Sequence, residues 1–244
     1  ASVIANAESC GKKIANKVLG CILDGYGYGL DGSSWGGELI QFNSHDLKFE
    51  LISQLAPLQV PGGDIAENEP WRIALALCIE NNLPFPEHLF VHPQAAQVVE
   101  LCKRKQFGTS TSLGRKFSAV AALLNIVTES KYEAHAAMVM ESIVHGLEVD
   151  FDYARLNLAG VPDFNLLIKR IYQIGIIEKN IQQAVNLFYG NLSVLIEKWI
   201  LFHCSTRGIS QVAISGGCWQ SRYLLSTLSD KFKRLGIELL IPYQ

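Results

Sequence analysis

The chain has 244 residues, of which 49 % are hydrophobic and 18 % are charged, a composition that excludes a disordered protein. Its formal net charge is −2, so it lacks the basic surplus of a nucleic-acid-binding protein. No apolar run reaches the ~18–20 residues of a membrane-spanning helix, and the N-terminus lacks the apolar core of a signal peptide. We therefore expect a cytoplasmic protein with neither nucleic-acid nor membrane partners.

The cysteines lack the spacing of a zinc site or a disulfide framework. They stand at positions 10, 21, 78, 102, 204 and 218. Most lie in apolar segments and no CxxC pair occurs, so we predict free thiols in a reducing cytosol. For the neighbours His203 and Cys204, packing in the core is favoured over metal binding.

The first part of the chain predicts a short helix followed by strands and a glycine-rich loop. A helix is expected within residues 1–17, and the apolar run 20–23 is typical of a buried strand. Residues 24–37 are expected to form a long glycine-rich loop. Residues 38–42 and 47–51 are predicted to be further strands, joined by a short turn.

From Pro70 onward the apolar residues follow helical spacing, with the proline well placed for a first helical turn. This helix should stop near residues 81–82. Further helices are predicted over residues 95–104, 117–126, 133–144, 164–172 and 178–202. The chain closes with a strand at 212–215, a helix at 220–234 and a strand at 237–241. This last β-α-β unit predicts that part of the sheet is parallel and that the fold class is α/β.

The glycine-rich segment has six glycines between Asp24 and Gly37. Gly27, Gly29 and Gly32 match GxGxxG, but a strand follows instead of a helix, which excludes a dinucleotide-binding loop. The Gly-Lys-Ser/Thr of a P-loop is absent. A strand–loop–strand phosphate clamp remains, in which Asp24 could hold Mg²⁺ or its water shell. The alternative is a glycine-rich hairpin without a ligand.

Four blocks of sequence carry motifs that occur in the same order in one known family. Residues 23–38 read LDGYGYGLDGSSWGGE, similar to DGTGYGxDGxxWGGE. Residues 61–77, PGGDIAENEPWRIALAL, are similar to PGGDxAxxEPWRMAL. Residues 114–124, GRKFSAVAALL, with YEAHAA at 132–137, are similar to GRLFDAVAALL and YEGQAA. Residues 215–225, SGGCWQSRYLL, are similar to SGGVFQNRLL. The chain thus resembles the HypF family of hydrogenase-maturation carbamoyltransferases.

The resemblance implies that residues 1–244 are a carbamoyl-transfer domain, truncated at both ends relative to the family. It implies an actin/sugar-kinase-like ATPase fold, related to ribonuclease H, with two lobes around a nucleotide cleft. Such a domain passes a carbamoyl group from carbamoyl-adenylate to the C-terminal cysteine thiolate of a HypE-type partner in nickel–iron hydrogenase maturation. The implied ligands are ATP or carbamoyl-AMP and Mg²⁺. The family's iron or zinc site lacks its ligands here, because its HHxAH and NDGG motifs would lie outside this sequence.

The resemblance also implies roles for matching positions. The phosphate and metal loop, with Asp24 as its catalytic residue, would comprise Asp24, Gly25, Gly27, Gly29, Asp31 and Gly32. The SGG block would bring backbone close to the nucleotide through Gly216 and Gly217, with Ser221 beside them. Gly114 would lie beside the adenosine, or simply start a helix. Glu133 matches the glutamate of YEG, and a solvated or capping glutamate is the equal alternative.

Other matched positions predict structural roles. Arg72 could pair with Asp64 or Glu69, and bracing of a loop is favoured over contact with a ligand. Cys218 stands where the family has valine, which favours a packed side chain over a nucleophile. Tyr26 replaces a threonine and could line the pocket, although it would crowd the loop.

Three departures from the family fall on ligand-facing positions. Ser118 replaces the aspartate expected at the ribose, Ser221 replaces an asparagine, and residues 134–135 are Ala-His instead of Gly-Gln. Loss of a charged hydrogen bond lowers affinity about ten- to hundredfold. The chain is therefore either a diverged working enzyme or a catalytically silent nucleotide-binding or scaffold relative. A small-molecule kinase of the same fold is disfavoured, because it leaves the EPWR and SGG blocks unexplained.

Overall fold

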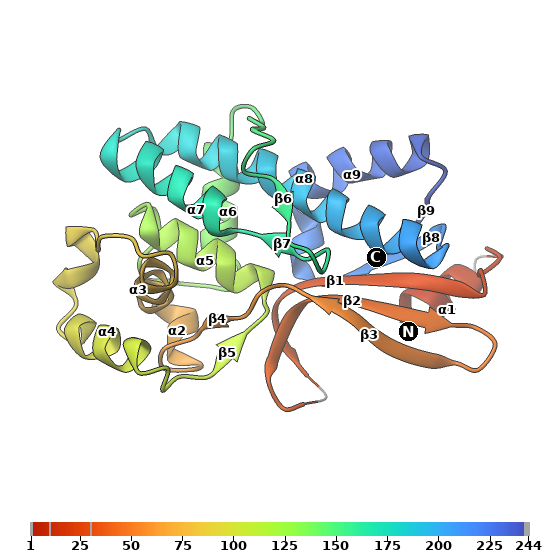
Figure 1. Ribbon diagram of the computed structural model, residues 1–244, viewed down its shortest axis with the longest axis horizontal. Coiled ribbons are helices and arrows are strands. Elements are labelled where there is room, and N and C mark those ends of the chain that lie inside the picture. The colour runs from red at the N-terminus through yellow and green to blue at the C-terminus, as the bar shows by residue number, and fades with distance from the viewer. Residues whose placement is uncertain (1, 10, 30, 242–244) are drawn as a thin grey trace.

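The structure is organised around one mixed β-sheet (Figure 1). The computed structural model describes residues 2–9, 11–29 and 31–241. Within these residues the sheet has seven strands in the order β4-β5-β2-β1-β8-β9, and β3 also pairs with β2. The strands are β1 (Lys17–Tyr28), β2 (Ser34–Asn43), β3 (Lys48–Gln54), β4 (Leu58–Gln59), β5 (Thr109–Ser110), β8 (Gln211–Ser215) and β9 (Glu238–Leu240). A separate hairpin, absent from the sequence-based expectations, pairs β6 (Arg155–Leu156) with β7 (Pro162–Asp163).

Alternating apolar residues explain why β1 lies at the centre of the sheet. Leu19, Cys21 and Leu23 point to one face and are fully buried in the main core. β1 pairs antiparallel with β2 and parallel with β8, and β8 pairs parallel with β9. The parallel pairing predicted for the closing β-α-β unit is therefore confirmed, as is the α/β class.

Helices make up most of the rest of the chain. The α-helices are α1 (Ser2–Ser9), α2 (Ile65–Asn68), α3 (Trp71–Glu80), α4 (Ala95–Lys103), α5 (Leu113–Leu123), α6 (His135–Ile143), α7 (Asn165–Tyr172), α8 (Ile181–Arg207) and α9 (Arg222–Arg234). Shorter helical turns are η1 (Glu87–Val91), η2 (Gln173–Ile177) and η3 (Gly217–Gln220). The 27-residue helix α8 starts where the Asn180 side chain accepts from Gln183 N, and it ends at left-handed Gly208.

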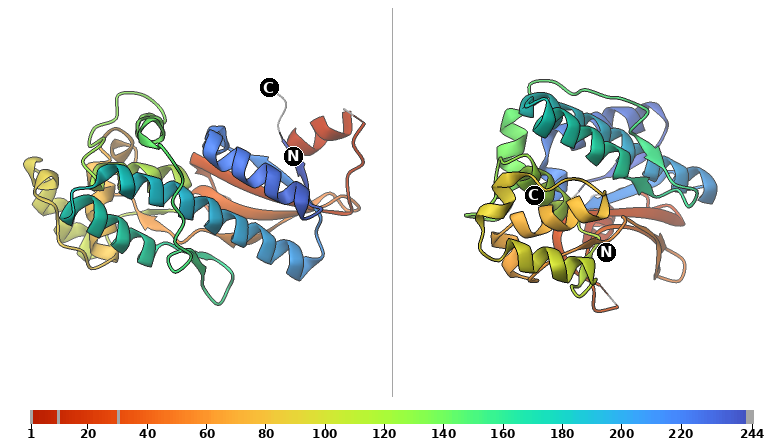
Figure 2. Two further views of the ribbon diagram at one scale, coloured as in Figure 1. Left: turned by 90° about the horizontal axis from the view of Figure 1, so that it is seen from above. Right: turned by 60° about the vertical axis from the view of Figure 1, so that its left-hand side comes forward.

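The helices divide the molecule into two halves that share α8. Figure 1 shows α2 to α7 gathered at one end with the short strands β4 and β5, and strands β1 to β3, β8 and β9 with α1 and α9 at the other. Helix α8 runs along both halves, and the view from above in Figure 2 shows the same arrangement. Buried side chains of α3, α5, α8 and β1 belong to a single hydrophobic cluster, so the core is continuous between the halves.

Several helix boundaries differ from the sequence-based ones. Helix α5 begins four residues earlier than expected, because the side chain of Ser112 caps it by accepting from Arg115 N. Helix α6 begins after Ala134, whose left-handed φ of 58° breaks the helical run that was predicted from residue 133. The first helix, α1, is shorter than its predicted span 1–17, and residues 1 and 10 of that span lie outside the described residues.

The cysteines agree with two expectations from the sequence. The described cysteines are free thiols, and Cys10 lies outside the described residues. His203 and Cys204 are both buried on α8, which confirms that they pack in the core. Among the described helices none is long and apolar enough to cross a membrane.

Candidate functional site

The glycine-rich segment forms a long hairpin instead of the predicted long loop. Strand β1 continues to Tyr28 and pairs with β2, with an irregularity in the register between Leu23 and Gly27. Asp31 and Ser33 lie between the two strands, and the Asp31 carboxylate accepts from the backbone N–H and the hydroxyl of Ser33. The long glycine-rich loop predicted over 24–37 was therefore wrong in its extent, because Gly27 and Tyr28 pair with Trp35 and Ser34.

Three separate chain segments meet at the irregular stretch of β1. Asp24 Oδ1 accepts from Gly25 N at 2.8 Å and from Gly217 N at 3.2 Å, so it links the hairpin to the SGG turn. A Cβ at Gly114 would lie 2.5 Å from Gly25 Cα, and one at Gly216 would lie 2.2 Å from the Leu23 carbonyl oxygen. Such approaches exclude any side chain larger than that of glycine. The predicted meeting of the Asp24 segment with the SGG block is therefore present.

Two buried polar side chains hold this meeting point. The Ser112 hydroxyl lies 2.7 Å from Asp24 O and 2.9 Å from Gly25 O, to which it donates, and it accepts from Arg115 N. The Glu38 carboxylate accepts from the backbone of Gly36 and Gly37 and from the hydroxyl of Thr111. These contacts fix the start of α5 and the start of β2 against the Asp24–Gly25 backbone.

A cleft of about 380 Å³ opens at this point between the hairpin, α5, the segment before α6, and η3. Its lining includes six of the predicted site residues: Asp24, Gly25, Gly114, Ser118, Glu133 and Gly217. Tyr26, which was expected to line the pocket, also lines this cleft, whereas Tyr28, farther along the hairpin, is 84 % exposed.

The remaining predicted residues do not line the cleft. Gly27, Gly29, Asp31 and Gly32 belong to the far part of the hairpin and its turn. Gly216 lies behind Gly217, packed against the backbone of β1. Ser221 caps no helix N–H with its side chain, and its hydroxyl is buried without a hydrogen-bond partner among the described residues.

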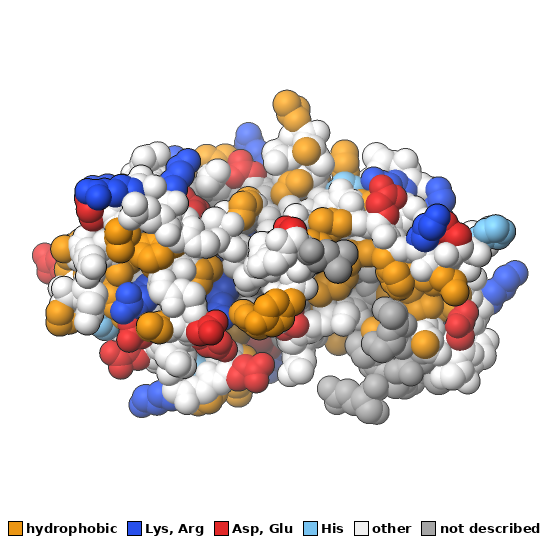
Figure 3. Space-filling model, turned by 90° about the horizontal axis from the view of Figure 1, so that it is seen from below, with side chains coloured by type: hydrophobic (Ala, Val, Ile, Leu, Met, Phe, Trp, Pro, Cys, Tyr) orange, Lys and Arg blue, Asp and Glu red, His pale blue; other side chains and the backbone are white. Residues whose placement is uncertain are grey.

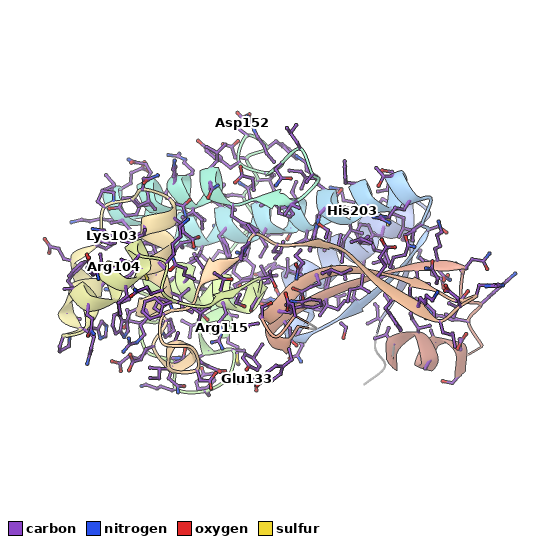
Figure 4. The ribbon with its side chains drawn as sticks, turned by 60° about the horizontal axis from the view of Figure 1, so that its bottom comes forward. Lys103, Arg104, Arg115, Glu133, Asp152 and His203 are labelled. Atoms are coloured by element: carbon purple, nitrogen blue, oxygen red, sulfur yellow. The ribbon has the colours of Figure 1, made fainter. Side chains whose placement is uncertain are left out.

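Several residues that line the cleft were not predicted from the sequence. They are Glu67, Arg115, Tyr132, His135 and Gln220, among others. Figure 4 shows Arg115 and Glu133 on the same side of the molecule, close to the hairpin. The space-filling view from below shows acidic side chains gathered on the helical half near the middle of that face (Figure 3). Arg115 stands next to Gly114 in the GRKFS block, which was the one signal in the sequence.

Cys218 lies in the cleft but is not an activated nucleophile. Burial, followed by the charge of Asp24, raises the pKa of the Cys218 thiol to about 12. The thiol is therefore protonated near neutral pH, whereas a reactive cysteine needs a lowered pKa. The geometry supports the prediction of a packed side chain.

The EPWR block braces the helical half and does not line the cleft. Arg72 Nε lies 2.6 Å from Glu69 Oε2, so the predicted pairing with Glu69 is confirmed. The Arg72 guanidinium lies 4.5 Å from the centre of the Trp71 ring, and the His92 ring stacks on that indole at 4.4 Å. These contacts connect the start of α3 to the segment between η1 and α4.

The described residues do not form a protein-bound metal centre. Within the described ranges no group of three or more His, Cys, Asp or Glu side chains is placed to hold a metal ion. The described residues therefore do not provide the donors of an iron or zinc site.

Comparisons with known proteins agree with this geometry. Residues 20–244 match the family model described as carbamoyltransferase, Kae1-like domain, second subdomain. Carbamoyltransferase HypF of Rhizobium leguminosarum bv. viciae is 31 % identical over 233 residues, covering 94 % of this chain and 30 % of the relative. A HypF homolog of Cupriavidus necator is 29 % identical over 247 residues, covering 92 % of this chain and 60 % of the relative.

Solved structures show the same fold. A crystal structure of full-length HypF in the phosphate- and nucleotide-bound form matches with a TM-score of 0.85 and 29 % identity, covering 99 % of this chain and 38 % of that one. The structure of T. kodakarensis HypF matches with a TM-score of 0.73 and 21 % identity, covering 93 % of this chain and 31 % of that one. The fold is the actin- and ribonuclease H-like ATPase fold. The chain, which spans less than two thirds of each of these relatives, belongs to the HypF carbamoyltransferase family.

Proposed function

We propose that the cleft binds the adenylate part of carbamoyl-adenylate and that the chain passes the carbamoyl group to a thiolate. In this reaction the sulfur attacks the carbamoyl carbon and an S–C bond forms. The bond between that carbon and the phosphate oxygen breaks, and AMP leaves with the electron pair. The acceptor would be the C-terminal cysteine of a HypE-type protein in nickel–iron hydrogenase maturation, and the protein's place would be the cytoplasm.

The observation that carries this proposal is the contact of Asp24 with Gly217 across the cleft, beside the close approach of Gly114 to Gly25. Gly25, Gly114 and Gly217, from three segments, line one cavity and carry no side chain, so a ligand can approach the main chain closely there. The similar full-length HypF structure is a phosphate- and nucleotide-bound form, which supports the same ligand class here.

Within the proposal, the cleft residues orient an activated substrate and contribute little covalent chemistry. The mixed anhydride already carries the activation, so the protein mainly positions the carbamoyl carbon for the incoming thiolate. Gly114 and Ser118, on the first turns of α5, would lie along the nucleoside. Glu133 borders the same space from the segment before α6.

Magnesium fits this site only as an ion carried by the nucleotide. Asp24 supplies one carboxylate at the proposed phosphate position, and its Oδ1 already accepts two backbone N–H bonds. Mg²⁺ in proteins is often held by one or two carboxylates together with phosphate oxygens and water. When bound, it would neutralise part of the phosphate charge.

Titration calorimetry with AMP and MgCl₂ tests the proposal. The chain should bind AMP, and Asp24→Asn should weaken binding about tenfold or more, because the carboxylate that links β1 to Gly217 loses its charge. Asp31→Asn at the hairpin turn is the matched control and should bind like the wild type. Absence of binding at millimolar AMP, or equal behaviour of the wild type and Asp24→Asn, would contradict it.

A catalytically silent nucleotide-binding relative is the second candidate, favoured by one observation. The Ser118 hydroxyl donates to Gly114 O at 3.1 Å, so it is engaged with its own helix and brings no charge to the ribose. Ser118→Asp should then raise affinity for AMP about ten- to hundredfold, and Ser221→Asn should add to it. Tight binding and carbamoyl transfer by the unmodified chain would exclude this candidate.

A further inference from the structure

Arg115 is a buried cation in the wall of the cleft. It follows Gly114 in the first turn of α5, and its side chain is only 7 % exposed. A guanidinium removed from water to this extent is stable only when its charge and its N–H groups have partners. The surroundings of Arg115 therefore indicate what it is placed to bind.

The partners of this guanidinium are incomplete. Arg115 Nη2 lies 3.3 Å from Glu67 Oε2, and the Glu67 side chain is 49 % exposed. This is the one hydrogen bond that the Arg115 side chain makes with the described residues, although a guanidinium has five N–H donors. The other donors remain for a molecule inside the cleft that Arg115 lines.

The charges around the cleft favour an anion at Arg115. Arg115 is the one lysine or arginine among the described lining residues, where the carboxylates of Asp24, Glu67 and Glu133 also lie. The N-terminal turn of the 11-residue helix α5 adds partial positive charge on the same side. An anionic ligand entering this space is therefore repelled by the carboxylates and attracted by Arg115.

We infer that Arg115 binds the phosphate of the adenylate and that Glu67 occupies the guanidinium when the cleft is empty. This inference rests on the proposed function, because it names the group that meets the phosphate of that ligand. Glu67, which is half exposed, accepts only one bond from Arg115, at 3.3 Å. An arginine can donate two parallel N–H bonds to two oxygens of one phosphate. The same contact holds the negative charge of AMP as the leaving group in carbamoyl transfer.

Comparison of AMP with adenosine tests the inference, since the two differ only in the phosphate. By calorimetry, Arg115→Gln should weaken AMP about ten- to hundredfold and leave adenosine within about twofold. Arg115→Lys should keep part of the AMP affinity. Glu67→Gln should tighten AMP several-fold without changing adenosine, because the competing carboxylate is gone.

The exposed pair Arg104 and Glu100 on the surface around α4 provides matched controls. Arg104→Gln and Glu100→Gln should leave both ligands unchanged, and thermal unfolding verifies that each variant is folded. Unchanged AMP binding in Arg115→Gln, or an equal loss of AMP and adenosine, would overturn the phosphate contact. If Arg115→Gln does not fold, unchanged AMP binding in Glu67→Gln overturns it instead. Failure of the wild type to bind either ligand overturns the proposed function, and this inference with it.

Discussion

Lys116 follows Arg115 directly, yet it lies on another face of α5 and has a different environment. Its Nζ donates to Ala56 O at 2.6 Å and lies 5.4 Å from the centre of the Phe164 ring. Burial lowers the pKa of Lys116 from 10.5 to about 8, and the charge of Glu80 offsets part of that effect. Consecutive cations on one helix thus have separate roles, one in the cleft wall and one in the packing.

The pKa of Lys116 predicts a rise of stability with pH. Between pH 8 and 10.5 the unfolded chain binds more protons at this lysine than the folded chain, so stability increases as pH rises. Buried thiols such as Cys78, with a pKa raised from 9.0 to about 12, act in the opposite direction as the pH rises toward and past 9, so the lysine contribution is measured as a difference between variants. In denaturant unfolding from pH 8 to 9, the wild type should gain about 1 kcal/mol of stability relative to Lys116→Met.

The exposed Lys103 on α4 is the control for this measurement. Lys103→Met should show the same pH dependence of stability as the wild type, because that side chain is exposed. An identical slope in Lys116→Met and the wild type would show that the buried amine is not the titrating group.

The sequence motifs predicted residues that lie where chain segments approach closely. They did not predict a residue such as Arg115, which stands out only because its side chain is buried. Asp24, Gly25, Gly114 and Gly217 could be assigned, because close approach of chain segments requires small residues at fixed motif positions. Arg115 could not, because the sequence does not show that its guanidinium is buried with one partner.

At the scale of elements, the hairpin of β1 and β2 shows how glycine misled the sequence-based prediction. Six glycines in the segment favoured a long loop, yet the strand pairing resumes after an irregular stretch, and Gly27 pairs with Trp35. Pairing is possible because glycine adopts extended backbone as readily as turns. Between the two strands, the Asp31 side chain accepts from Ser33 and marks the turn.

Helix α5 is the element that joins the cleft to the core, and Ser112 controls its start. Ser112→Ala removes the cap from Arg115 N and the donor to the carbonyls of Asp24 and Gly25. Because the site is buried, we expect a loss of roughly 1–3 kcal/mol in the free energy of unfolding, measured with urea.

Ser142 on α6 is a suitable reference for that substitution. Its hydroxyl donates to Val139 O on the exposed side of the helix, and Ser142→Ala should change stability by less than about 0.5 kcal/mol. If Ser112→Ala is equally mild, the hydroxyl does not hold α5 against the hairpin.

At the scale of the whole molecule, the order of the motifs predicted the family and the fold better than the pattern of single elements did. The blocks around Asp24, Gly114 and Gly217 are far apart in sequence, and the structure brings all three to one cleft. The 155–163 hairpin and the exact helix ends were not predictable, because they depend on contacts such as the cap by Ser112.

Helix α8 belongs to both halves and meets other backbone closely. A Cβ at Gly190, in its middle, would lie 1.9 Å from the Glu148 carbonyl oxygen. The helix is roughly 40 Å long at 1.5 Å per residue, so it runs along both halves of the molecule (Figure 1). Its side chains contribute to the single core cluster, as Phe188 and Trp199 do with complete burial.

This shared helix has a practical consequence for anyone who wishes to dissect the protein. Cutting the polypeptide between the sheet and the helical bundle would sever α8 and expose Phe188 or Trp199 to solvent. The sheet and the helical bundle therefore do not separate into independent pieces, and any fragment, split reporter or domain swap has to include the entire helix α8.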